Sequence, residues 1–265
     1  MHELDSLFMN LVRPYVGMEM MRLGDANDGG YVLPKVVVEE TRLLVSLGYG
    51  HNSKFERAFL QAQKKLRCRI FDKDIKLSVV FSETLRQFEQ KLKGSHGRPL
   101  VWTKALVRYI QLLYTPRLKY FVSEVVASGN LEGQTVFNSL LEKSTASGQL
   151  TLKIDIEGGE YSCLESLCGN FSGIDCLIVE FHNIRLELER LKVLLHAIST
   201  FMLLVNTHVN NYSRVVEGKP DCVELTFISK RYISSADLKP ANRIPSDLDS
   251  PCNPKHPEIT FIYKN

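Results

Sequence analysis

The sequence lacks long apolar runs and a strong charge of either sign. Its most apolar segment, residues 191–205, contains Lys192 and His196, so it is too short and too polar to span a bilayer. The formal net charge is only +3, which gives no electrostatic argument for nucleic acid or a membrane surface as a partner. We therefore expect neither of these partners.

The six cysteines include no Cys-x-x-Cys pair, and several lie in apolar strand or helix patterns. This distribution argues against a zinc ribbon or a disulfide framework and favours reduced, buried thiols. A signal-peptide pattern is also missing, because Glu3 and Asp5 stand where positive charge would be expected. The sequence predicts a cytoplasmic protein whose residues 1–265 form one large domain.

Short strand patterns alternate with helix patterns along the chain, without an internal repeat. The expected strands of the sheet are residues 42–47, 69–71, 120–126, 151–156, 176–181, 201–205, 223–229 and 259–263. Strands that alternate with helices form parallel βαβ units with right-handed crossovers. No helix separates the last two strands, so we expect an α/β fold with a mostly parallel sheet and an antiparallel edge strand.

Two segments stand outside this alternation. Residues 1–34 predict an amphipathic helix stopped by Pro14, followed by a polar turn and a short strand. Residues 75–118 are helical over a greater length than one crossover needs. We expect them to form a helical insertion over the active edge of the sheet, where it would act as a substrate cap.

A glycine turn, Gly48-Tyr49-Gly50, follows the strand 42–47, and Asp72 ends the next strand. Glycines let the backbone approach a ligand, and an acid one strand later accepts hydrogen bonds from a ribose. Dinucleotide sites need a third glycine, but Ser53 stands there, so S-adenosylmethionine fits better than a pyrophosphate cofactor. The alternative is a tight turn in which Asp72 caps a helix.

Acids and histidines follow three further strands. Asp155 and Glu157 end one strand, Glu180 and His182 end the next, and His208 follows the strand after that. Side chains that converge from strand ends either act as a general base or hold a divalent cation, for which Asp155, Glu180 and His182 are the candidate ligands. The alternative is a helix cap and a polar rim without chemistry.

Two polar segments remain open at this level. Asn210, Asn211 and Tyr212 form an amide-rich segment that either binds substrate hydroxyls or forms a turn. The segment Asp28-Gly29-Gly30-Tyr31 is either a hairpin turn or a cofactor lid.

The sequence resembles the FkbM-type S-adenosylmethionine-dependent methyltransferases over roughly residues 22–263. The residues that carry the resemblance are Asp28-Gly29-Gly30-Tyr31, Ser46-Leu47-Gly48-Tyr49-Gly50, Lys153-Ile154-Asp155-Ile156-Glu157-Gly158-Gly159-Glu160, Val179-Glu180-Phe181-His182 and Pro251-Cys252-Asn253-Pro254. The run that begins at Lys153 is the most specific of them. Ser46 departs from the family, whose commoner glycine turn has an acid there, so Asp28 or Asp155 would supply that carboxylate.

The resemblance implies a class I (Rossmann-like) methyltransferase fold, with seven strands and the last one inserted antiparallel. It implies an O-methyltransferase acting on a sugar or nucleotide-linked sugar, in bacterial surface polysaccharide or natural-product biosynthesis. Gly48, Tyr49 and Gly50 would line the methionine part of the cofactor and Asp72 its ribose. Asp155 would lie beside the transferred methyl group.

The expected mechanism is in-line attack of a substrate hydroxyl on the activated methyl group, with one base that removes the proton. His208 is the favoured base and His182 the second candidate, and a cation is the alternative activator. An inactive Rossmann-like binding domain and a metal-dependent hydrolase are the rival functions. The oligomeric state and the acceptor atom are not encoded in any pattern that we identify.

Overall fold

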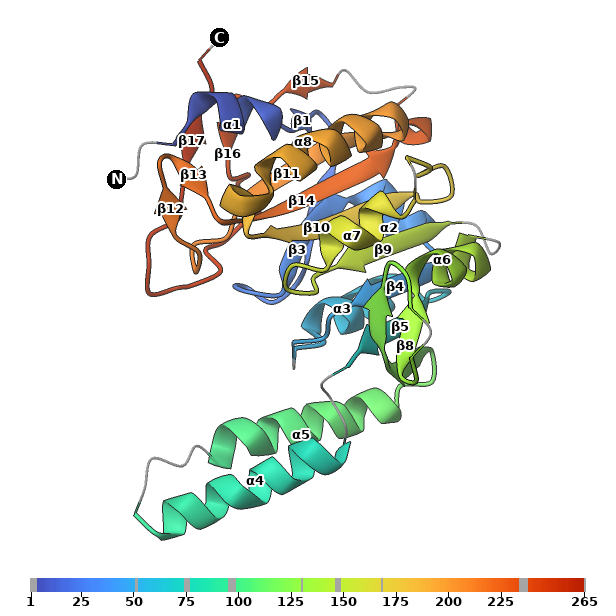
Figure 1. The fold of residues 1–265 in the computed structure, drawn as a ribbon, viewed down its shortest axis with the longest axis vertical. Helices are drawn as coiled ribbons and strands as arrows, with labels where there is room; N and C mark the ends of the chain where they lie inside the picture. The colour runs from blue at the N-terminus through green and yellow to red at the C-terminus, as the bar shows by residue number, and fades with distance from the viewer. Residues whose placement is uncertain are drawn as a thin grey trace.

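Seven strands form one sheet in the order β11-β14-β10-β9-β4-β5-β6, with helices on both faces (Figure 1). Neighbouring strands pair in parallel except β14, which is antiparallel to both β10 and β11. The strands are β4 (Leu43–Leu47), β5 (Arg67–Asp72), β6 (Leu118–Val122), β9 (Leu150–Ile154), β10 (Cys176–His182), β11 (Met202–Val209) and β14 (Cys222–Ser229). This computed structural model describes residues 4–50, 52–73, 77–94, 99–129, 131–145, 149–167, 169–233 and 238–264.

The predicted mostly parallel sheet with antiparallel pairing at one edge is confirmed. The antiparallel strand β14 lies one place in from the edge strand β11. The predicted strand 259–263 is wrong as a member of this sheet, because only Phe261–Ile262 (β17) is extended and it pairs with Arg243–Ile244 (β16). The segment 253–257, which precedes β17, is held by Asn211. The amide of Asn211 donates hydrogen bonds to the carbonyls of Asn253, His256 and Pro257.

The central strands are buried on both faces, as parallel strands with helices on either side are. In β4, Leu43, Val45 and Leu47 point into one core and Leu44 points into the other. Four helices cover the first face: α1 (Ser6–Leu11), α6 (Phe137–Thr145), α7 (Glu160–Glu165) and α8 (Ile184–Phe201). The second face is covered by α2 (Lys35–Glu40), α3 (Lys54–Ala62) and the hairpin of β2 (Met20–Gly24) and β3 (Gly30–Pro34).

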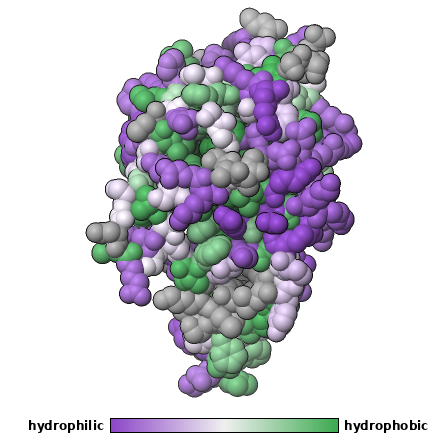
Figure 2. Space-filling view, turned by 90° about the vertical axis from the view of Figure 1, so that its right-hand side faces the viewer, coloured by the Kyte–Doolittle hydropathy of each residue, from purple (hydrophilic) through white to green (hydrophobic). Residues whose placement is uncertain are grey.

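The helical insertion is a pair of helices, α4 (Leu77–Leu92) and α5 (Pro99–Leu113), that projects from the β5–β6 side of the sheet (Figure 1). Val80 of α4 belongs to the second core, and Trp102 and Leu106 of α5 pack against that core. Its helices carry exposed apolar side chains, namely Phe81, Leu85, Phe88, Leu92, Val107 and Ile110. Apolar residues are visible at the lower end of the molecule in Figure 2. The predicted segment 75–118 also includes residues 75, 76 and 95–98, which lie outside the described residues.

Short elements complete the fold. They are β1 (Tyr15–Val16), β7 (Glu124–Val126), β8 (Gln134–Val136), β12 (Val215–Val216), β13 (Lys219–Pro220), the 3-10 helix η1 (Lys230–Tyr232) and β15 (Lys239–Pro240). Cys68, Cys163, Cys176, Cys222 and Cys252 are free and buried, as predicted, whereas Cys168 lies outside the described residues. Within the described ranges, no helix has both the length and the apolar character that crossing a bilayer requires.

Candidate active site

A cavity of about 760 Å³ opens at the carboxyl ends of β4, β5 and β9. Its lining includes the glycine turn after β4, Asp72 at the end of β5, and Asp155 and Glu157 after β9. Ligands of open α/β sheets bind at this edge. The volume also lies within the roughly 300–1,000 Å³ of small-molecule sites.

The two glycines of the turn serve different purposes. Gly48 has a φ of 83°, and a Cβ there would lie 1.6 Å from the carbonyl oxygen of Asp155, so the β4 and β9 backbones meet only because the side chain is missing. Gly50 has a φ of 53°, and a Cβ there would meet nothing within 4 Å. Gly50 therefore borders open space in the cavity.

Asp72 holds the turn from the neighbouring strand. Its Oδ2 accepts a hydrogen bond of 2.7 Å from the backbone N–H of Tyr49. Asp72 lines the cavity, while the Tyr49 ring is buried in the second core. The acid that the sequence placed one strand after the glycine turn therefore lies against that turn.

Asp155 is fixed by a buried lysine. The Nζ of Lys153 donates to Asp155 Oδ2 over 3.1 Å and to the carbonyl of Gly48 over 3.2 Å. Burial alone would lower the pKa of Lys153, but the charges of Asp155 and Glu56 outweigh it and raise that pKa. Lys153 thus stays a cation and holds the strand end and the glycine turn together. The hydroxyl of Tyr31 adds a longer contact of 3.4 Å to the same carboxylate oxygen.

His182 is oriented by the fully buried Glu160. Oε1 of Glu160 lies 3.1 Å from Nδ1 of His182 and accepts the backbone N–H of the same residue at 2.7 Å. With Nδ1–H donating to this carboxylate, Nε2 becomes the proton acceptor. Burial alone would lower the pKa of His182, but the Glu160 hydrogen bond and the charge of Glu180 raise it to about 9.

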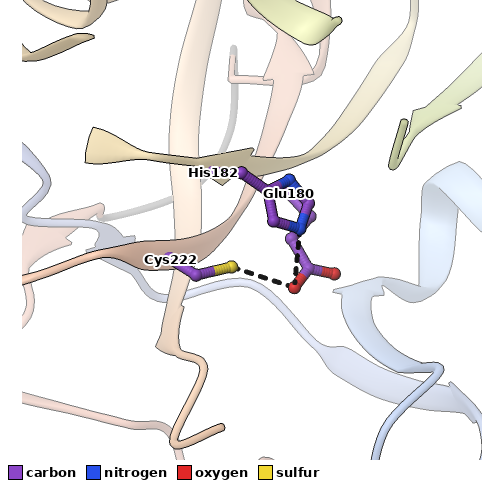
Figure 3. Close-up of side chains that lie close together, drawn as sticks. All are labelled: Glu180, His182 and Cys222. Carbon is purple, nitrogen blue, oxygen red and sulfur yellow. Dashed lines mark hydrogen bonds and ion pairs between the residues drawn. The ribbon is translucent and has the colours of Figure 1, made fainter. Parts of the chain in front are cut away.

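Glu180 lies beneath His182, away from the cavity lining. Its Oε1 accepts from the thiol of Cys222 at 3.0 Å and lies 3.7 Å from His182 Nε2 (Figure 3). The amide of Asn210 donates to the same oxygen at 2.7 Å. Burial, with the charges of Asp155 and Glu224, raises the pKa of Glu180.

The predicted metal ligands are arranged differently from the expectation. In the described part of the chain, three groups hold their ligand atoms within 4.8 Å of one another: Glu180, His182 and Cys222; Asp155, Glu157 and His182; His208, Glu224 and Cys252. The expected trio of Asp155, Glu180 and His182 is divided between the first two groups. His182 is common to both.

The expectation that His208 faces an incoming substrate is wrong. Its side chain is 1% exposed and sits between Glu224, 2.8 Å from Nδ1, and Glu258, 3.2 Å from Nε2. The strand β11 continues to Val209, so His208 is a sheet residue rather than a residue beyond the strand end. Both ring nitrogens are engaged, which leaves His182 as the candidate base. His182 is not itself a lining residue of the cavity, but its Nε2 lies 3.6 Å from the carboxylate of the lining residue Glu157.

The predicted substrate residues do not line the same cavity as the glycine turn. Asn210 and Asn211 are buried, and their amides bind Glu180 and the segment 253–257 respectively. Asn211 and the exposed Tyr212 line a second cavity of about 770 Å³, together with residues 256–260. Any contact of these two residues with a ligand would therefore occur in that second cavity.

Three predicted cofactor residues, Asp28, Tyr49 and Ser53, also lie outside the cavity lining. Ser53 is buried at the start of α3. Asp28 lies on the exposed turn between β2 and β3, where its carbonyl accepts from the Asn52 amide at 3.2 Å. Gly48, Gly50, Asp72 and Asp155 are the predicted cofactor residues that line the cavity.

Sequence reasoning did not assign roles to Lys153 and Glu160. Both residues belong to the segment 153–160. A lysine inside an otherwise buried strand is unusual, so the position of Lys153 in the sequence could have indicated a functional or structural role. Glu160 looks like an ordinary acid in the first turn of a helix. Nothing in the sequence indicated that Val125, Val126 and Ser128, near β7, would line the cavity.

No protein-family model matches the sequence, and no curated protein matches it. Several solved structures are similar. A dimethyladenosine transferase from Plasmodium falciparum is 11% identical, with 75% of this chain and 62% of that chain covered at a TM-score of 0.40. TrmK of M. capricolum, in complex with S-adenosyl-homocysteine, is 14% identical over 74% of this chain and 65% of that chain, at a TM-score of 0.34. The O-methyltransferase NcsB1 from neocarzinostatin biosynthesis, in complex with S-adenosylmethionine, is 10% identical over 71% of this chain and 49% of that chain, at 0.31.

The chain spans less than two thirds of the length of each of these three proteins. The fold assignment rests on the strand order of the chain itself. An antiparallel β14 between β10 and β11, in an otherwise parallel seven-stranded sheet, defines the class I (Rossmann-like) methyltransferase fold.

Proposed function

We propose that this protein is an S-adenosylmethionine-dependent O-methyltransferase. The observation that supports the proposal is that the glycine turn, Asp72 and the acids that follow β9 all line the same cavity. The open Gly50 position and the Asp72 carboxylate lie at one part of it, and Asp155 and Glu157 lie at another. His182 adjoins that second part, 3.6 Å from the Glu157 carboxylate.

The residues present fit the cofactor. Gly50 leaves room for a bound group against the backbone, and Asp72 offers a carboxylate where a ribose would be held. S-adenosylmethionine would supply an already activated methyl group, so the chain has to align the reactants and remove a proton. The Glu160–His182 pair supports that second task.

A hydroxyl acceptor is favoured by this histidine–carboxylate pair. A hydroxyl acceptor must lose its proton as it attacks the methyl group. A nucleobase nitrogen with a free lone pair can attack without losing a proton. An oriented general base such as His182 therefore favours an oxygen acceptor over a nitrogen acceptor. We therefore keep a sugar or nucleotide-linked sugar as the proposed acceptor class, as the FkbM-type resemblance implies. A cation held by Asp155, Glu157 and His182 is the alternative activator, and EDTA would then abolish turnover.

Replacing Gly50 by Ala tests the cofactor site. The new methyl group would occupy the space that we assign to S-adenosylmethionine, so we expect calorimetry to show at least a tenfold weaker affinity, equivalent to about 1.4 kcal/mol. Gly94→Ala is the matched control, because Gly94 has a φ of 75° and open space, but lies outside the cavity lining. Equal affinities in both variants would refute the site.

The rival functions give different results in the same assays. A wild-type protein that binds neither S-adenosylmethionine nor S-adenosylhomocysteine would be an inactive Rossmann-like domain. Turnover that continues without any methyl donor would indicate the metal-dependent hydrolase. Labelled methyl transfer to RNA, with none to nucleotide-linked sugars, would replace the proposed acceptor class.

The pH dependence follows from the raised pKa of His182. A general base works only when deprotonated, so the group with a pKa of about 9 is mostly inactive at neutral pH and becomes active as the pH rises. We expect kcat/KM to increase from pH 7 and to level off above about pH 9. A rate that is flat between pH 7 and 9.5 would exclude His182 as the base in the free enzyme.

A further inference from the structure

A second group of side chains lies deeper in the sheet than the cavity. Glu180, Glu224 and His208 occupy directly opposite positions on β10, β14 and β11, so they form a row on one face of the sheet. Two carboxylates directly opposite each other across a strand pair repel. Either an imidazolium ion at His208 or a bound metal cation would relieve this repulsion.

Cys252 closes the far end of the row. Its Sγ lies 3.8 Å from His208 Nδ1 and 3.5 Å from Glu224 Oε1, and Glu224 Oε2 lies 2.8 Å from His208 Nδ1. All three residues are buried, with at most 5% of the residue surface exposed. Thiolate, imidazole and carboxylate together are a ligand set that suits zinc.

From the geometry of His208, Glu224 and Cys252 we infer a buried, structural zinc site. Zinc bonds of about 2.0–2.3 Å at tetrahedral angles separate the ligand atoms by roughly 3.3–3.6 Å. The separations are 3.8 Å from Sγ to Nδ1, 3.5 Å from Sγ to Oε1 and 2.8 Å from Nδ1 to Oε2, so an ion would have to move the His208 and Glu224 side chains apart by about half an ångström. The two oxygens of Glu224 face the other two side chains, Oε2 toward Nδ1 of His208 and Oε1 toward Sγ of Cys252, so the three residues would offer four ligand atoms. Binding releases the thiol proton of Cys252 and any proton on Nδ1 of His208.

Glu258 supports the site from outside. Its carboxylate lies 3.2 Å from Nε2 of His208, the ring nitrogen that faces away from Cys252. A metal-bound histidine commonly donates its second N–H to a carboxylate, which fixes the ring. Glu258 also lines the second cavity.

The ion would fasten the segment that carries Cys252 to the sheet. This segment already meets the β2–β3 turn, because the Asn27 amide donates to the Pro251 carbonyl at 2.8 Å. That hairpin includes Tyr31, which contacts Asp155 at the cavity edge. The inferred ion would therefore hold this segment in place, and it would not itself contact the reacting groups of the proposed transfer reaction.

Cobalt substitution in the full chain tests the inference. We expect metal-free protein to bind one equivalent of Co²⁺, with an absorption band from thiolate-to-metal charge transfer, and zinc to displace it. Cys252→Ser should remove the band, while Cys222→Ser, a matched buried thiol beside Glu180, should retain it. Glu258→Gln should weaken zinc binding by about 10- to 100-fold.

Two outcomes would overturn the site. Wild-type protein without a charge-transfer band would show that His208 is held by its two carboxylates as an imidazolium ion. A band lost in Cys222→Ser and kept in Cys252→Ser would place the ion at Glu180 and His182 instead. Both readouts are independent of methyl transfer, so they do not depend on whether the proposed function holds.

Discussion

We expect His182→Ala to lower kcat by about 10²–10⁴-fold, the usual contribution of a positioned general base. The variant loses the imidazole beside Asp155 and Glu157, while the glycine turn and Asp72 stay intact. Binding of S-adenosylhomocysteine should therefore change little. Steady-state kinetics with labelled S-adenosylmethionine, paired with calorimetry, separates the two effects.

Two further variants make this result specific. His196→Ala removes an exposed histidine of α8 and should leave kcat unchanged. Glu160→Gln keeps the size of the side chain but weakens its hold on Nδ1, so kcat should fall and the pH profile should shift downward from about 9. A His182→Ala enzyme with wild-type turnover would eliminate the base that we assign.

The second large effect concerns stability. Gly48→Ala places a methyl group 1.6 Å from the Asp155 carbonyl oxygen in addition to requiring a φ of 83°, so β4 and β9 must separate. We expect the free energy of unfolding to fall by about 3 kcal/mol or more, which urea denaturation would measure.

Gly133→Ala is the control for the backbone contribution alone. Gly133 has a φ of 82°, and a Cβ there would meet no atom within 4 Å, so its replacement should cost only about 1–2 kcal/mol. Similar losses in the two variants would mean that the close approach of β4 and β9 does not matter for stability.

The parallel strand β4 could be predicted from its run of apolar residues, and β9 from the alternation of apolar and polar residues, although both strands are buried on both faces. The role of His208 could not. Asn206, Thr207 and His208 break the apolar pattern, so the strand was expected to end at Val205, whereas β11 runs to Val209 and pairs His208 with Glu224. Polar residues in a buried strand are satisfied by partners distant in sequence, which local patterns do not reveal.

The residues of the candidate site also fall into two groups, those that local sequence patterns predict and those that they do not. Gly48, Gly50 and Asp72 follow local strand–turn patterns, and they line the cavity. The partnership of Glu160 with His182 spans 22 positions and two elements, so no spacing rule predicts it. The substrate-cap role of the α4–α5 hairpin stays a prediction, since no described residue of these two helices lines that cavity.

The place of β14 has a consequence for synthesis of the chain. In the seven-stranded sheet, β11 has β14 as its sole neighbour, yet β14 follows it in sequence. In a nascent chain that ends before Cys222, the β11 segment therefore has no strand to pair with. One edge of β10 is also left without its hydrogen-bonding partner. An unpaired strand edge of this kind can form β-sheet hydrogen bonds with other chains, which leads to aggregation. We expect ribosome-bound intermediates to depend on chaperones until Ser229 has emerged.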